Sequence, residues 1–103
     1  MIFDLSNPVL SLDGEPIKDG NTDKLLTVSS LVINALMTTY KDDAECKGEE
    51  KLKRFNISES AMKNASQVEL TSTDVAFILK YVEKAGFSPL AYKRIYEILE
   101  KKE

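Results

Sequence analysis

The chain has 103 residues, 43% of them hydrophobic and 30% charged, which predicts one folded domain and not a disordered segment. Its 14 Lys and Arg side chains face 17 Asp and Glu, and the net charge of −3 argues against a domain whose whole surface follows a phosphate backbone. The single cysteine, Cys46, excludes an internal disulfide and a cysteine-rich zinc site, and no apolar run is long enough to predict a membrane helix.

Residues 1–25 predict a β-hairpin followed by a loop. Asp13-Gly14 suits a tight hairpin turn because both positions tolerate a positive φ, and residues 9–12 and 15–17 supply the two short arms. Residues 19–23 form a second turn cluster, and the helical part of the domain is expected over 26–103. The N-terminus lacks the basic start and continuous apolar core of a signal peptide, so we expect a cytoplasmic protein.

A first helix is predicted from the N-cap Thr27 to about Tyr40. Its core-facing stripe recurs at helical spacing, and Ile33 and Met37 widen it. Because the apolar stripe is wide, we expect this helix to be the most buried one of the domain. The stripe consists of Val28, Leu31, Val32, Ala35 and Leu36.

A second helix is predicted to start near Gly48, followed by two glutamates whose charge suits the first turn of a helix. Its buried side is expected at Leu52, Phe55 and Met62. Several polar residues weaken its middle, so a break near residues 56–58 is an alternative to one continuous helix.

Two further helices are predicted over 72–85 and 89–100. Thr71 and Asp74 form a capping pattern for the first, Gly86 suits the left-handed position that ends it, and Ser88-Pro89 is an N-cap and first-turn pair for the second. Residues 68–70 alternate like a short strand. The predicted fold is therefore mainly α (α+β), with about four helices and a small N-terminal β-hairpin, which residues 68–70 extend to three strands in one alternative.

An enzyme built from this chain would have to rely on carboxylates, lysine or tyrosine. The chain has no histidine, the usual general base near neutral pH and the commonest transition-metal ligand. Its four glycines are isolated, so no phosphate-binding loop is present. We therefore expect no enzyme, no cofactor and no metal site.

Phe77 and Tyr81 lie four residues apart, beside the apolar stripe of the third helix, and give it a wide apolar girdle. Such a helix is either central in the fold or covers a protein partner. In the second case the chain is a non-enzymatic interaction protein, with Phe77 and Tyr81 as anchors that bind another protein or form a homodimer.

A DNA-binding protein is the alternative, with helices 72–85 and 89–100 as a helix-turn-helix. Lys93 and Arg94 on the second of these helices would then contact the nucleic acid. Glu97 and Glu100 are interleaved with these cations and disfavour contact with phosphates.

Several segments together resemble a group of small phage- and prophage-encoded proteins. The matching segments are 12–17, 26–36, 48–54, 88–90 and 96–100, and they span most of the chain. The resemblance implies a phage or prophage origin, a bacterial host and a short chain that stands alone. It implies no activity, so no functional residues are carried over, and the polar stretch 56–65 departs from the pattern.

Overall fold

A computed structural model describes residues 1–18 and 24–100, and within them the fold is mainly helical. The four α-helices are α1 (Val28–Met37), α2 (Gly48–Lys63), α3 (Ser72–Lys84) and α4 (Pro89–Leu99). A short 3-10 helix, η1 (Asp43–Glu45), precedes α2, and β1 (Ile2–Phe3) pairs with β2 (Val68–Glu69) in a small antiparallel sheet. The predicted class, mainly α with four helices, is confirmed.

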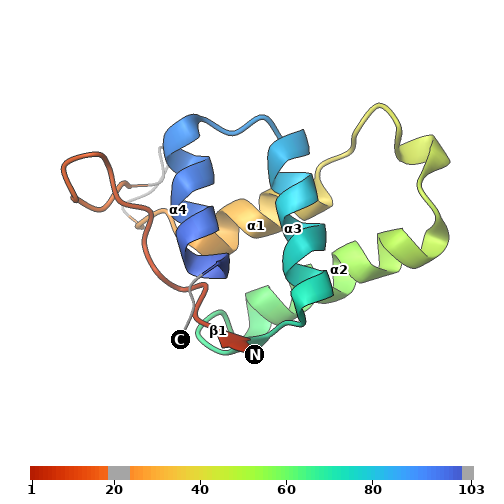
Figure 1. The fold of residues 1–103 in the computed structure, drawn as a ribbon, viewed down its shortest axis with the longest axis horizontal. Coiled ribbons are helices and arrows are strands. Elements are labelled where there is room, and N and C mark those ends of the chain that lie inside the picture. The colour runs from red at the N-terminus through yellow and green to blue at the C-terminus, as the bar shows by residue number, and fades with distance from the viewer. Residues whose placement is uncertain (19–23, 101–103) are drawn as a thin grey trace.

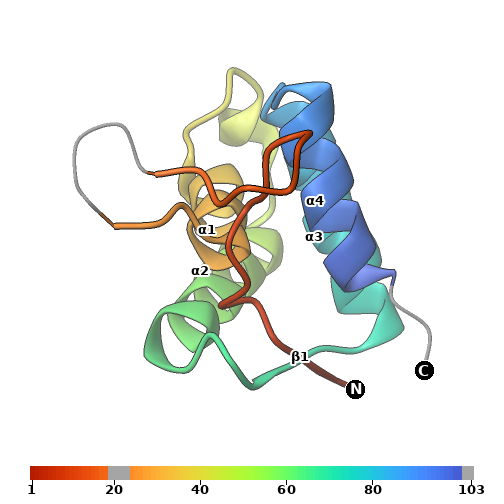
Figure 2. The same cartoon turned by 90° about the vertical axis from the view of Figure 1, so that its left-hand side faces the viewer.

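Helix α1 lies at the centre of the fold, in contact with α2, α3 and α4. Figure 1 shows α3 and α4 side by side with α1 crossing behind them. In Figure 2, α1 and α2 form one layer and α3 and α4 the other. Apolar side chains from both layers fill the space between them, chiefly Val28, Val32, Leu36, Ile78, Val82 and Ile95.

The predicted start signals of three helices are confirmed. The hydroxyls of Thr27 and Ser88 each accept a hydrogen bond from the backbone N–H three residues ahead. Thr71 and Asp74 form a reciprocal capping box, with distances of 3.1 and 3.0 Å. Gly86 follows α3 with φ +70°, the left-handed conformation that glycine adopts without steric cost.

The N-terminal segment forms the predicted turn but not the predicted strands. Gly14 has φ +87° and donates a hydrogen bond to the carbonyl of Ser11. The arms are joined by an isolated bridge between Leu10 and Pro16. The ladder does not continue, because the N–H of Val9 donates to the carbonyl of Leu26 and that of Glu15 to the Asp13 carboxylate. The second turn cluster, 19–23, lies outside the described residues.

The three-strand alternative is wrong for the described residues. Strand β2 pairs with β1 and not with the hairpin, in the register Ile2–Glu69 and Phe3–Val68. Phe3 and Val68 are both buried, so this pairing joins two core residues from distant parts of the chain.

Helix α2 is continuous from Gly48 to Lys63, so the break considered near residues 56–58 does not occur. Ser58 donates its hydroxyl hydrogen to the carbonyl oxygen of Arg54 at 2.9 Å and is thus satisfied within the helix.

The predicted buried side of α2 is wrong. Leu52, Phe55 and Met62 retain exposed fractions of 64%, 49% and 72%. The inward face instead carries Arg54, Ile57, Ser58 and Ala61. The small residues allow α2 to approach α1 closely, and the hydroxyl of Ser29 on α1 donates to the carbonyl of Ala61 at 3.2 Å.

Candidate functional site

Arg54 is a charged side chain in the core, only 6% exposed, and it binds the end of α1. Its Nε donates to the carbonyl of Leu36 and its Nη2 to the carbonyl of Thr38, both at 2.7 Å. Its Nη1 pairs with Asp43 at 3.0 Å. The guanidinium therefore provides partners for backbone carbonyls at a helix C-terminus, where intrahelical partners are missing.

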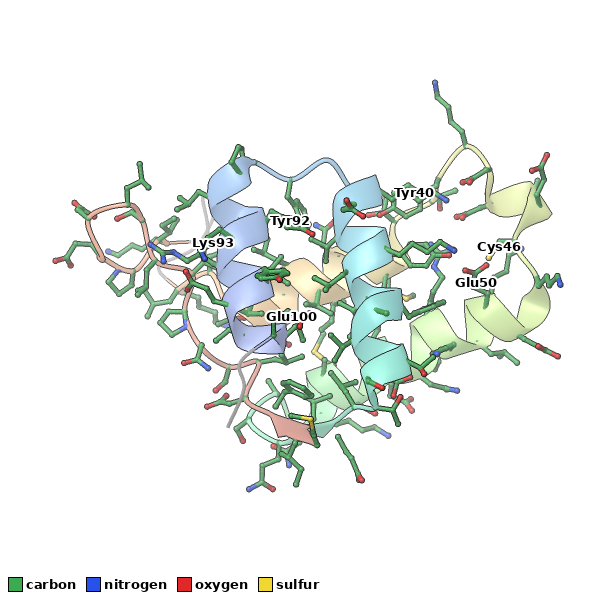
Figure 3. The ribbon with its side chains drawn as sticks, in the orientation of Figure 1. Tyr40, Cys46, Glu50, Tyr92, Lys93 and Glu100 are labelled. Carbon is green, nitrogen blue, oxygen red and sulfur yellow. The ribbon has the colours of Figure 1, made fainter. Side chains whose placement is uncertain are left out.

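Aromatic and polar side chains surround this guanidinium, and we call Tyr40, Cys46, Glu50, Arg54 and Tyr81 the Arg54 cluster. The Arg54 guanidinium carbon lies 5.6 Å from the centre of the Tyr40 ring. The Sγ of Cys46 lies 3.2 Å from Glu50 Oε2 and 3.9 Å from the Tyr81 hydroxyl. Figure 3 shows Cys46 and Glu50 close together at the start of α2.

The charge states of the groups around Arg54 are fixed by their neighbours. The hydrogen bond from Lys80, at 2.9 Å, holds the pKa of Glu50 below its usual range. Burial raises the pKa of the Tyr81 phenol. At neutral pH the carboxylate is ionised and the phenol protonated, whereas a general acid or base works best with a pKa near the working pH. Through the bonds of Arg54 to the end of α1 and its contact with the Tyr81 ring, the Arg54 cluster holds α1, α2 and α3 together.

The structure brings Phe77 and Tyr81 together but does not leave them on an open face. Their ring centres are 5.2 Å apart. Tyr81 is only 1% exposed, so its expected role as a surface anchor does not fit its position in the core. Phe77 is half-buried, and the Lys53 ammonium lies 4.8 Å from its ring centre. At Tyr81 the apolar girdle of α3 is therefore buried in the core.

The two cations of the DNA-binding alternative also have partners within the chain. Arg94 Nε donates to the carbonyl of Leu10 at 2.9 Å, and its Nη2 donates to that of Ser11 at 2.8 Å. Lys93 lies 3.7 Å from Glu97 and remains exposed (Figure 3). Arg94 thus fastens the N-terminal segment to α4, and binding a phosphate would break those bonds.

An exposed apolar face lies on the layer of α1 and α2, which sequence reasoning missed. We call Ile33, Met37, Phe55 and Met62 the α1/α2 face. Met37 is 51% exposed, and Ile33 is half-buried. Met37 and Phe55 line a hollow of about 180 Å³, and Ile33 and Met62 line another of about 330 Å³.

A sequence signal for this face existed in α1. None of the ten residues of α1 is charged, although Ser30, Asn34 and Met37 face outward. A charge-free helix with an exposed side is typical of an interface, because charged residues are depleted at interface centres and methionine is enriched.

A comparison with models of known protein families gives no match, and comparisons with curated proteins and with solved structures find none that is similar. The resemblance to small phage proteins therefore stays a prediction. Among residues 1–18 and 24–100, no group of His, Cys, Asp or Glu side chains could hold a metal ion. No helix in the same residues is both long and apolar enough to cross a membrane.

Proposed function

We propose that this chain is a non-enzymatic protein that acts by binding another protein chain through the α1/α2 face. The observation that carries the proposal is the exposure of Met37, Phe55 and Met62 on one layer of a small domain. Large apolar side chains exposed on two neighbouring helices favour an interaction site, and flexible methionines adapt to a partner's shape.

The charge around this face also favours a protein partner. The α1 side contributes no charge. Two cations line the Met37–Phe55 hollow, and Arg54 is buried and paired with Asp43, which leaves Lys51 as the exposed one. Nucleic-acid binding needs several cations along one surface. A phage or prophage origin, as the resemblance implies, would place the partner among phage or bacterial proteins.

Site-specific photo-crosslinking tests the proposal. A photoreactive phenylalanine analogue replaces Phe55 in one protein and Tyr96, which is 42% exposed on α4, in the control. Both proteins are irradiated in bacterial cells and in purified form at high concentration, and the products are identified by mass spectrometry.

We expect a defined product from position 55, but not from position 96, that disappears when Met62→Asp is added. Equal yields from the two positions, or no product from position 55 in either setting, would refute the proposed function.

A further inference from the structure

We propose that the occupant of this face is a second copy of the same chain, with the two α2 helices packed antiparallel across a twofold axis at Phe55. This inference rests on the proposed function and names its partner. It comes from the order of side chains along the outward flank of α2, where residues four apart lie above one another on one helix face.

Lys51, Phe55 and Glu59 form a stripe on α2 with a cation at one end, an aromatic ring in the middle and an anion at the other. In an antiparallel pair centred on Phe55, Lys51 of each copy lies opposite Glu59 of the other. The twofold operation therefore creates two complementary ion pairs and one aromatic contact, as an isologous interface requires.

The next positions along the flank are complementary in size. Gly48 and Met62 lie seven residues to either side of Phe55, so the same axis places Met62 of one copy over Gly48 of the other. A Cβ added at Gly48 would meet no atom within 4 Å, so the space beside it is open. A long flexible side chain opposite a glycine lets the two helices approach closely.

The charged ends of the stripe are available for this pairing. No ion pair of Lys51 occurs in the part of the chain that the structure describes. Glu59 forms only an exposed contact with Lys63 at 3.7 Å, and exposed contacts within a helix contribute little. Met37 on α1 borders the stripe and extends the apolar contact.

Sedimentation equilibrium of the purified full chain between about 5 and 500 μM tests the inference, since a contact made chiefly by one helix gives weak association. We expect a mass that rises from monomer to dimer. Lys51→Glu and Glu59→Lys should each weaken the dimer by at least about fivefold, because each replaces two attractions with two repulsions. The double variant should restore dimerisation to within about threefold of the wild type.

The matched control is the charge swap Lys93→Glu/Glu97→Lys on α4. Lys93 and Glu97 form an exposed pair at 3.7 Å, the same distance as the Glu59–Lys63 contact, but they lie away from α2. Dimerisation of this control should equal that of the wild type, and helical circular dichroism of every variant should be unchanged.

A second measurement locates the axis. In a Cys46→Ser background, Phe55→Cys should form a symmetric intermolecular disulfide with oxidised glutathione as the oxidant, which is itself reduced. Tyr96→Cys on α4 is the control, since Tyr96 is 42% and Phe55 49% exposed, and it should form no disulfide-linked dimer.

A monomer at all concentrations, failure of the double variant to restore association, or equal disulfide yields from the two cysteine variants would overturn the inference. The two proposals can fail separately: if position 55 crosslinks to a different protein and the purified chain is monomeric, the dimer inference fails and the proposed function stands.

Discussion

The guanidinium carbon of Arg54 lies 4.6 Å from the centre of the Tyr81 ring, so a cation from α2 stacks on an aromatic side chain from α3. Both side chains are buried, and the guanidinium also binds two carbonyls at the end of α1. The side chain of Arg54 therefore joins three helices. Stacking of this kind is a property of arginine that lysine does not reproduce.

Replacing Arg54 should strongly destabilise the fold. Arg54→Ala removes the guanidinium donor from Asp43 and from two backbone carbonyls, and a buried acceptor left without a donor costs about 1–3 kcal/mol. Urea unfolding followed by circular dichroism measures the loss. Lys93→Ala, a change at the surface, should stay within about 0.5 kcal/mol of the wild type. Equal effects of the two substitutions would show that the Arg54 contacts do not stabilise the protein.

Tyr81 should behave as a core residue. Tyr81→Ala removes a ring from a site with almost no exposed surface and should cost about 3–5 kcal/mol. Tyr81→Phe keeps the ring and loses only the hydroxyl near Cys46, so the cost should fall to about 0.5–1.5 kcal/mol. The same unfolding measurement separates the two. A Tyr81→Ala protein of wild-type stability would mean that the ring is not packed as described.

The orientation of α2 can be tested by comparing its two faces. Ile57→Ala removes buried methyl groups and should cost about 2–5 kcal/mol. Met62→Ser on the outward flank should change the free energy of unfolding by no more than about 0.5 kcal/mol. The measurements belong at low protein concentration, where association does not contribute. The reverse order of the two effects would support the orientation predicted from the apolar residues alone.

Arg94 should control the exchange of the N-terminal turn. Arg94→Ala removes both hydrogen bonds to the carbonyls of Leu10 and Ser11, and we expect faster hydrogen exchange at the amides of Gly14 and Ile17. Hydrogen exchange by NMR reports each amide separately. Lys93→Ala, next to it on α4, is the control and should leave these rates unchanged. Unchanged rates in Arg94→Ala would show that the turn is held by its own backbone contacts.

Asp74 should contribute to stability at neutral pH and lose that contribution in acid. The backbone N–H of Thr71, followed by Lys53, lowers the pKa of Asp74 in the folded protein. The unfolded value is about 3.9, so the contribution is complete above it and is lost as the pH falls through the folded value. We expect Asp74→Asn to be less stable than the wild type at neutral pH, with the difference shrinking below about pH 4. Urea midpoints across this range measure it, and a constant difference would contradict the assignment.

Local signals allowed much of the fold to be predicted. The caps at Thr27, Thr71 and Ser88 each depend on a few neighbouring residues, and all three lie where the sequence placed them. The position where α1 ends could not be predicted from such neighbouring residues. It stops at Met37 instead of near Tyr40, and its last carbonyls bind an arginine from another helix.

The inward face of α2 could not be predicted because hydrophobicity was the wrong guide there. A ranking by apolarity selects Leu52, Phe55 and Met62, whereas the buried side contains Arg54 and Ser58. Arg54 is stabilised inside by carbonyls and rings that only the folded chain brings together. Phe55 and Met62, which the sequence assigned to the core, are exposed and form the α2 part of the candidate binding face.

The bonds from Arg54 to the carbonyls of Leu36 and Thr38 also bear on how the chain acquires its structure. The end of α1 is completed by a residue supplied 16 to 18 positions later, so α1 is incomplete until α2 has docked. A nascent or truncated chain that stops before residue 54 lacks this donor. We therefore expect the two helices to open together, as one cooperative unit in hydrogen exchange.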